Sequence, residues 1–298
     1  MRHVRNPRPQ CGKADELRRV GVSGNAARSV PAPLESGYIN VGALGIYYER
    51  RGHGAPLALL HGAMGTIESC FAQLAPALAH DFDVIAVELQ GHGHTRDIAR
   101  PLTYEGMAGD TAALLRALDI QRSHCVGYSM GGAVALQLAL DRPELVDRLV
   151  FAGGASFDTS GVYPELLASF ESFDPQQLDG TPWQEAYQRV APEPGAWNSL
   201  LAKVNELDRA GVSWPKERLA SLRAPTLLMI GDADLVRPEH TVEMFRLLGG
   251  GVPGDLVELP PAQLAILPGT SHVGMLNRVD WLSSMIVSFL KQSPSQPQ

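Results

Sequence analysis

From residue 56 the chain alternates short, unbroken apolar runs with segments of helical periodicity. A strand buried on both faces of a sheet has such a run, and a helix between two strands allows them to be parallel. The pattern therefore predicts an α/β fold with a mostly parallel central sheet that helices cover on both faces. The predicted strands are 56–62, 82–91, 123–129, 146–155, 224–232 and 262–270, and the predicted helices include 103–120, 130–143, 239–248 and 278–291.

Residues 38–52 precede this alternation and contain two strand patterns joined at a glycine turn, which predicts a hairpin. The alternation breaks between residues 156 and 222, where no buried strand is evident. A helical insertion between two strands of one sheet accounts for the break, and we call residues 156–222 the cap. The core then comprises residues 37–155 and 223–291.

The two ends of the chain differ in composition from this core. Residues 1–36 are rich in arginine and poor in large apolar side chains, which predicts a disordered leader. Its arginines are not followed by an apolar stretch, so it does not resemble a secretory signal, and we expect a cytoplasmic protein. Residues 292–298 are polar and predict a flexible tail.

The composition argues against several kinds of partner. A formal net charge of -7 does not favour nucleic-acid binding through phosphate contacts. No apolar run approaches the length of a membrane span, so we expect no membrane association. Cys11, Cys70 and Cys125 are too few and too scattered for a disulfide framework or a zinc site. We expect no cofactor and no metal, and the sequence leaves the oligomeric state open.

Ser129 is the candidate nucleophile. It lies in the pattern G-x-S-x-G, between the predicted strand that ends at it and the predicted helix 130–143. A serine at the tip of a sharp strand-to-helix turn needs neighbours without Cβ atoms, because larger side chains would collide with the strand and the helix. The start of the following helix also directs N–H groups toward a reacting carbonyl oxygen.

A serine hydroxyl needs a general base and an acid that orients the base. Among nine histidines, His272 stands out because its loop directly follows the last predicted strand, where functional groups gather in open α/β sheets. Asp232 and Asp234 follow the preceding strand. We favour Asp234 as the acid, because Asp232 is placed to cap its own turn, whereas Asp234 can reach the neighbouring loop.

Residues 37 to 291 resemble the α/β-hydrolase superfamily, in its cap-bearing branch of esterases, lactonases and C–C hydrolases. Five motifs in the family's order carry the resemblance: "LLHG" (59–62), "LQGHGHT" (89–95), "GYSMGG" (127–132), "GDADLVRP" (231–238) and "GTSHVG" (269–274). The resemblance implies an oxyanion hole formed by the backbone N–H groups of Ala63 and Met130, with His61 shaping the loop. Glu88 stands where the family usually has an aspartate, which would alter how the glycine-rich loop is braced.

These features predict a serine hydrolase that acts on a carboxylic ester or lactone with an apolar portion, through an acyl-enzyme intermediate. Cleavage of a C–C bond in a diketone-like acid, and of an amide or peptide, would use the same residues. A non-catalytic small-molecule receptor is a further alternative. His92, His94 and Asp97 superficially resemble a metal site, but no second cluster accompanies them.

The cap carries eight aromatic residues, for which two interpretations stay open. They could line an apolar pocket for the substrate, or they could form the cap's own core. They are Phe157, Tyr163, Phe170, Phe173, Trp183, Tyr187, Trp197 and Trp214.

Overall fold

The structure is a computed structural model, and it describes residues 35–292. The first strand begins at Glu35, two residues before the start predicted for the core. The rest of the predicted leader, and residues 293–298 of the predicted tail, lie outside the described residues.

Eight strands form one sheet in the order β1-β2-β4-β3-β5-β6-β7-β8. The β1–β2 hairpin is antiparallel, β2 also pairs antiparallel with β4, and the remaining neighbours are parallel, which confirms the predicted fold class. The strands are β1 (Glu35–Val41), β2 (Leu44–Gly52), β3 (Ala55–Leu60), β4 (Phe82–Val87), β5 (Ser123–Tyr128), β6 (Val146–Ala152), β7 (Thr226–Ala233) and β8 (Ala262–Ser271).

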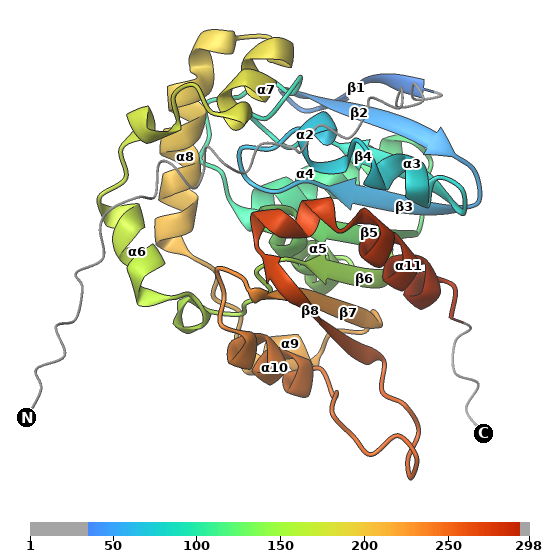
Figure 1. Cartoon of the computed structure of the whole chain (residues 1–298). Helices are drawn as coiled ribbons and strands as arrows, with labels where there is room; N and C mark the ends of the chain where they lie inside the picture. Colours follow the sequence, from blue (N-terminus) through green and yellow to red (C-terminus); the bar gives the residue numbers. More distant parts are fainter. Residues whose placement is uncertain (1–34, 293–298) are drawn as a thin grey trace, which may run out of the picture.

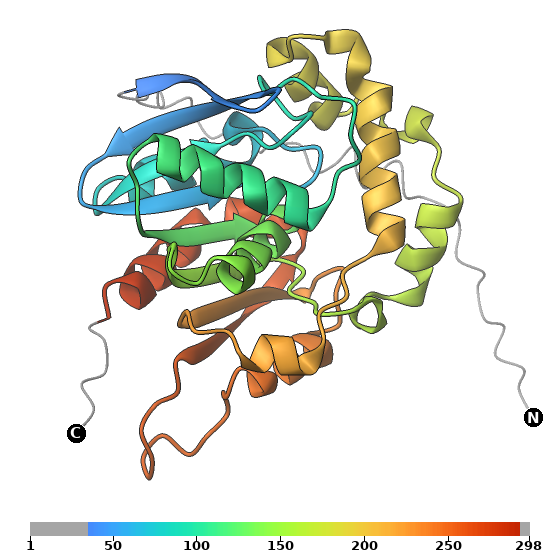
Figure 2. The same ribbon diagram turned by 180° about the vertical axis from the view of Figure 1, so that it is seen from behind.

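Helices cover both faces of the sheet (Figures 1 and 2). Helices α4, α5 and α10 supply one apolar cluster, and α2, α3 and α11 supply the cluster on the opposite face. The helices are α2 (Ile67–Phe71), α3 (Leu74–Leu78), α4 (Tyr104–Ala117), α5 (Met130–Asp141), α6 (Pro164–Glu171), α7 (Pro182–Val190), α8 (Trp197–Ala210), α9 (Lys216–Ala220), α10 (Pro238–Leu247) and α11 (Val279–Leu290).

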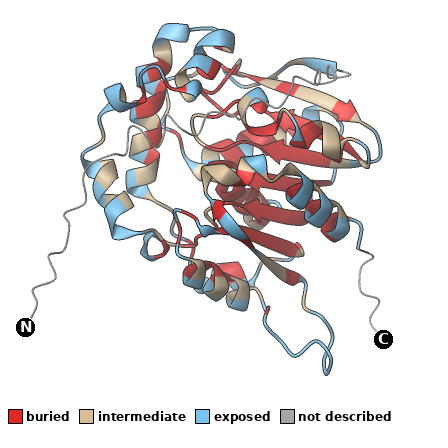
Figure 3. Ribbon diagram, viewed as in Figure 1, coloured by how far each residue is buried: buried red, intermediate tan, exposed pale blue. Residues whose placement is uncertain are grey.

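The central strands explain why the apolar runs are unbroken. Every residue of β4 and of β5 is buried, because helices pack on both sides of these strands (Figure 3). Alternate side chains of a strand point to opposite faces, so each face must be apolar. In β5, Cys125 belongs to one apolar cluster and Val126 to the other.

Helices α6 to α9 lie between β6 and β7 along the chain. Helices α6, α7 and α8 stand beside the edge at which the parallel strands end (Figure 1). Four of the aromatic residues there are buried in the cluster that also contains α4 and α5: Phe157, Tyr187, Trp197 and Trp214. The rings of Tyr187 and Trp197 are 5.3 Å apart, and the Trp214 indole N–H donates to Gln137 of α5 at 2.7 Å. These four side chains are therefore packing residues that join the insertion to the core.

Residues 35–292 contain no helix that combines the length and the apolar character needed to cross a membrane.

Candidate active site

Three polar residues follow three strands of the sheet at the first position beyond each strand. Ser129 follows β5, Asp234 follows β7 and His272 follows β8. Parallel strands end at the same edge of a sheet, so the topology brings together residues that are 38 to 143 positions apart. The arrangement depends on β6, which separates β5 from β7 and leaves room between them.

A continuous pair of hydrogen bonds joins these residues. Nε2 of His272 lies 2.8 Å from Oγ of Ser129, and Nδ1 lies 2.8 Å from Oδ1 of Asp234. A carboxylate can only accept, so the partners place the ring proton on Nδ1 and leave Nε2 to accept the serine proton. The Asp234 side chain has no solvent exposure and that of His272 is 12% exposed, so the relay is largely shielded from water.

Ser129 occupies a strained turn between β5 and α5. Its φ of 55° and ψ of -121° lie outside the regions that residues with a side chain prefer, at a cost of about 1–3 kcal/mol. The neighbouring glycines permit the turn, because a Cβ atom on Gly127 would lie 2.1 Å from the carbonyl oxygen of Gly131. A Cβ atom on Gly131 would lie 2.2 Å from the carbonyl oxygen of Leu60. The glycines are thus required by close packing around the serine.

Asp234 is held in its charged form by hydrogen-bond donors. Burial alone would raise the pKa of this carboxyl. The hydrogen bond and charge of His272, together with the backbone N–H groups of Leu235 and Val236, outweigh burial and lower the pKa. A carboxylate that stays ionised can orient the imidazole and stabilise it when it becomes protonated.

Asp232 has a different position from Asp234. Its carboxylate accepts the backbone N–H groups of Gly269 at 2.9 Å and Thr270 at 3.0 Å, and these bonds lower its pKa. It therefore braces the end of β8 from which His272 extends. The sequence suggested a turn cap within its own loop, but the structure places this cap across to the neighbouring strand.

The two predicted oxyanion-hole residues lie next to the serine turn. Met130 is the first residue of α5, where backbone N–H groups have no partner within the helix. Ala63 follows the β3 loop residues His61 and Gly62, and a Cβ atom on Gly62 would lie 3.3 Å from Cβ of Ser129. Within residues 35–292, neither the Ala63 nor the Met130 N–H donates to another protein group.

His61 shapes the loop after β3 through two hydrogen bonds to backbone. Its Nδ1 pairs with the Gly62 carbonyl at 2.7 Å, and its Nε2 accepts the N–H of Leu89 at 3.1 Å. Burial, together with the nearby His92, lowers the pKa of His61 to about 3. The His61 imidazole is therefore neutral, and both of its ring nitrogens are engaged with the backbone around the loop after β3.

Glu88 braces the glycine-rich loop that follows β4. One carboxylate oxygen accepts the N–H of Ile67 at 3.1 Å, and the other accepts from the backbone and the ring of His94, the ring at 2.9 Å. The longer side chain therefore links the loop to the start of α2. The buried carboxylate has donors on both oxygens, which offsets the cost of burying its charge.

The residues that superficially suggested a metal site each have another partner. Nδ1 of His92 contacts the Gln90 carbonyl at 2.9 Å, while Asp97 forms an ion pair of 2.6 Å with Lys203 of α8. The Lys203 ammonium also donates to two carbonyl oxygens of the same loop. No group of three or more possible metal ligands gathers anywhere in residues 35–292. Lys203 thus fastens α8 to the glycine-rich loop.

Sequence reasoning missed Tyr128, which lies beside His272. Its hydroxyl donates to the His272 carbonyl at 3.0 Å, and its ring lies 5.2 Å from the imidazole. The residue precedes Ser129 in the strand, so its side chain points to the face that carries the β8 loop. No local signal distinguishes it from an ordinary buried strand residue.

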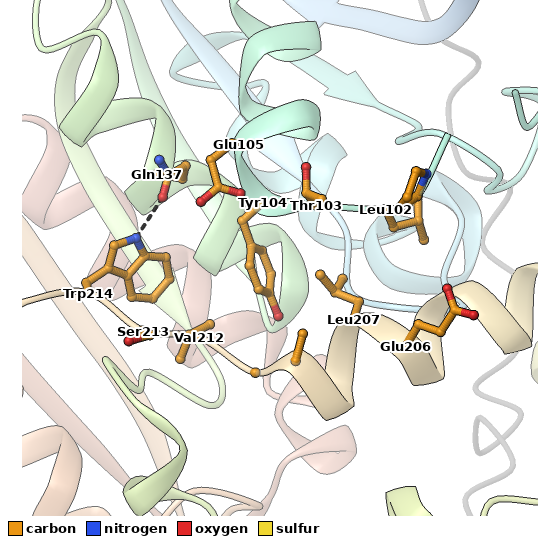
Figure 4. A pocket seen from close by; sticks show the side chains of 13 residues that line it. Leu102, Thr103, Tyr104, Glu105, Gln137, Glu206, Leu207, Val212, Ser213 and Trp214 are labelled. Atoms are coloured by element: carbon orange, nitrogen blue, oxygen red, sulfur yellow. Dashed lines mark hydrogen bonds between the residues drawn. The ribbon is translucent and has the colours of Figure 1, made fainter. Parts of the chain in front are cut away.

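A cavity of about 350 Å³ opens between the start of α4 and the end of α8 (Figure 4). Its lining includes Tyr104, Leu207 and Trp214, and Gln137 forms part of it. Neither Ser129 nor His272 lines this cavity. It is therefore a space beside the insertion and not the place at which the serine would meet a substrate.

The sheet order and the serine turn define the class of protein. A family model described as the alpha/beta hydrolase fold matches residues 55–218 of the chain. The chain belongs to this family.

A curated relative aligns with most of the chain. Over 267 residues the sequence is 31% identical to a pimeloyl-[acyl-carrier protein] methyl ester esterase of Vibrio atlanticus, which spans 83% of this chain and 98% of the relative.

Two solved structures share the fold. An N-acyl homoserine lactone degrading enzyme, Est816, has a TM-score of 0.64 and 24% identity and covers 85% of this chain and 99% of its own. The 2-hydroxy-6-oxo-6-phenylhexa-2,4-dienoate hydrolase of a Rhodococcus strain has a TM-score of 0.66 and 23% identity. The match covers 87% of this chain and 99% of the hydrolase chain. At this identity the two structures show likeness of fold alone.

Proposed function

We propose that this α/β-hydrolase cleaves a carboxylic ester or lactone through Ser129, His272 and Asp234. The observation that carries the proposal is the pair of 2.8 Å contacts that links the three side chains at the ends of β5, β7 and β8. In this arrangement His272 removes the proton of the Ser129 hydroxyl as the oxygen attacks the carbonyl carbon. Asp234 holds the ring and stabilises the imidazolium that forms.

The negative charge that develops on the carbonyl oxygen needs donors that are already in place. The backbone N–H groups of Ala63 and Met130 are next to the serine turn and have no other acceptor among residues 35–292. We assign them to the oxyanion hole, where each donor contributes about 3–4 kcal/mol of transition-state stabilisation. His272 then protonates the leaving alcohol, and a water that it activates releases the acyl group from Ser129.

The relatives favour an ester-like substrate. The curated relative that covers 83% of this chain is named for a methyl ester, and one structural neighbour is described as degrading a lactone. Another neighbour is named for a dienoate that carries a ketone, so C–C cleavage is a rival outcome of the test. We further propose that residues 156–222 act as a cap over the site, because helices α6 to α8 stand at the edge where Ser129 lies.

The test is a panel of p-nitrophenyl esters, lactones, amides and a vinylogous diketone, measured with the wild type and with Ser129→Ala. We expect a burst of p-nitrophenol from the wild type, followed by steady turnover. Ser129→Ala should lower kcat by at least about 10⁴-fold, because the nucleophile is lost while the fold stays intact. Ser284→Ala, an exposed serine of α11, is the matched control and should behave as the wild type.

Each other result points to a different function. Turnover of the diketone but of no ester or lactone would replace the ester proposal while keeping the serine mechanism. Binding of ligands by the wild type without any turnover would favour a receptor and would overturn the proposal.

A further inference from the structure

Tyr128 is a buried side chain between the serine turn and the loop that carries His272. It is the last residue of β5, and its ring belongs to the apolar cluster that α2, α3 and α11 supply. Only 6% of the residue is exposed. A buried tyrosine hydroxyl usually finds a hydrogen-bond partner, and this one donates to the backbone carbonyl of His272 at 3.0 Å.

Two glycines fix the position of the Tyr128 ring. A Cβ atom on Gly62, in the loop after β3, would lie 2.9 Å from Cδ1 and from Cε1 of the ring. A Cβ atom on Gly153, directly after β6, would lie 2.9 Å from Cε2 on the opposite edge. The backbone of two loops therefore lies against both edges of the ring, closer than a residue with a side chain would allow. The ring has little freedom to shift, so the core also fixes where its hydroxyl lies.

The hydroxyl contacts the backbone of His272 at the point where the loop after β8 turns into the 3₁₀ helix η4 (Val273–Asn277). The same carbonyl also accepts the N–H of Met275, at the longer distance of 3.4 Å. The Tyr128 hydroxyl is thus the shorter of these two contacts. The imidazole lies beside the Tyr128 ring, with 5.2 Å between the ring centroids.

Small movements of the His272 backbone matter because the imidazole must satisfy two partners together. Nε2 lies 2.8 Å from Ser129, and Nδ1 lies 2.8 Å from Asp234. A ring that rotates or slides to keep one of these contacts lengthens the other. The side chain can therefore serve both partners only when its backbone stays in place.

We propose that Tyr128 is a positioning residue, whose hydroxyl holds the backbone of His272 where the imidazole reaches both of its partners. The inference rests on the proposed hydrolase mechanism and adds a group that acts through His272. Because the Tyr128 ring also lies against Gly62, in the loop of the proposed oxyanion hole, it sets the general base and that loop at a fixed distance. The reaction needs both at once, since the oxyanion forms as the serine proton is taken.

The contacts of Tyr128 disfavour a direct part in proton transfer. Its hydroxyl proton is already donated to a backbone carbonyl, which is not a general base. Burial raises the pKa of this hydroxyl well above its usual value, so the group stays a donor at neutral pH.

Tyr128→Phe tests the proposal, because it keeps the ring and removes only the hydroxyl. We expect kcat for a p-nitrophenyl ester to fall by about five- to twentyfold, because a smaller share of the molecules has His272 in line with Ser129. Formation and release of the acyl group both use His272, and the ring still packs against the two glycines. We therefore expect KM to stay within about twofold of the wild-type value.

Tyr187→Phe is the matched control. Tyr187 is also buried, and its hydroxyl also donates to a backbone carbonyl, that of Glu193 at 3.4 Å, but it lies in the insertion. We expect this variant to keep the wild-type kcat and KM. An equal loss of kcat in both variants would show a general effect of removing a buried hydroxyl and would overturn the positioning role.

Proton NMR of the resting protein reports on His272 without any turnover. The proton between Nδ1 of His272 and Asp234 is expected far downfield, and its absence from His272→Gln identifies it. In Tyr128→Phe we expect this resonance to move upfield or to broaden, because the imidazole is held less firmly against the carboxylate. Tyr187→Phe should leave it unchanged.

The two measurements separate this inference from the hydrolase proposal. A changed resonance in Tyr128→Phe, in a protein whose wild type turns over no ester, would support the positioning role while the hydrolase proposal fails. An unmoved resonance in Tyr128→Phe, with or without a loss of kcat, would overturn the positioning role and leave the hydrolase proposal intact. A raised KM with unchanged kcat would also overturn it, because Tyr128 would then act on substrate binding.

Discussion

The loop after β7 and the last turn of α8 each bring an aspartate under the influence of His272, in opposite environments. Asp234 accepts from His272 and from two backbone N–H groups, and its pKa is lowered. Asp208 accepts from no group within the described chain, and its pKa is raised to about 7. Burial acts on both carboxyls in the same direction, so the number of donors decides which one stays charged.

The difference teaches that two acids near one histidine can serve separate purposes. In the core, three donors meet Oδ1 of Asp234 and favour its charged form, as the proposed stabilisation of an imidazolium requires. The insertion leaves Asp208 without a donor among the described residues. The first arrangement favours the charged form of the acid, as the proposed role of Asp234 requires, whereas the second favours the neutral form of Asp208.

The largest expected difference between the two acids is in the turnover of a neutral ester. In Asp234→Asn the amide can donate to Nδ1 of His272, which places the ring proton on Nε2 and leaves it unable to accept the Ser129 proton. We expect kcat to fall by about 10³- to 10⁴-fold. Asp208→Asn should lower it by less than about tenfold. Equal losses in the two variants would show that the acids do not have separate roles.

A smaller effect should separate Asp234 from its neighbour Asp232. Asp232→Ala removes two acceptors from the backbone of β8, so we expect His272 to be less well positioned and kcat to fall by about three- to tenfold. Asp255→Ala, in the exposed loop before β8, is the control. A loss as large as that of Asp234→Asn would contradict a bracing role.

The stability of the Asp232 variant should depend on pH. The folded state lowers the pKa of Asp232, so its contribution is present above the unfolded value of about 3.9 and is lost as the pH falls through the folded value. The melting temperature of Asp232→Ala should therefore lie below that of the wild type at neutral pH, and the two should converge below about pH 4. A constant difference across this range would rule out the carboxylate as the cause.

The sequence predicts the residues of the core better than it predicts those of the insertion. Ser129, Asp234 and His272 each stand one position beyond a strand, so a sequence pattern that locates the strands also locates the three residues. The order of the strands then brings them to one edge. In the structure the carboxylate of Asp234 contacts His272, whereas that of Asp232 contacts the backbone of β8.

The insertion could not be predicted to the same depth. Its helices have amphipathic patterns, but how they sit on the sheet depends on contacts between distant residues, such as Trp214 with Gln137 and Lys203 with Asp97. The only local sign of Asp208 is an acid at a position where the period of α8 calls for an apolar residue. The position of this acid can be interpreted only when the residues that pack against the buried face of α8 are known.

The smallest expected effect concerns the cost of leaving Asp208 without a partner. Its pKa is raised in the folded state, so between about pH 3.9 and 7 folding takes up a proton, and stability falls as the pH rises. Above pH 7 the buried charge is fully unfavourable. Asp208→Asn should therefore be more stable than the wild type at pH 8, by about 1 kcal/mol after allowance for solvent near the carboxyl, or roughly 2 °C in Tm.

The gain should shrink toward zero as the pH approaches 4, where the wild-type carboxyl is protonated in both states. Glu206→Gln, at an exposed position two residues before Asp208 in the same helix, should show no such trend. A variant that is more stable at pH 8 and unchanged at pH 4 would show that the charge of Asp208 is unfavourable in the folded state. If Asp208→Asn is less stable than the wild type at pH 8, the carboxyl has partners that make it structural, and the contrast with Asp234 fails.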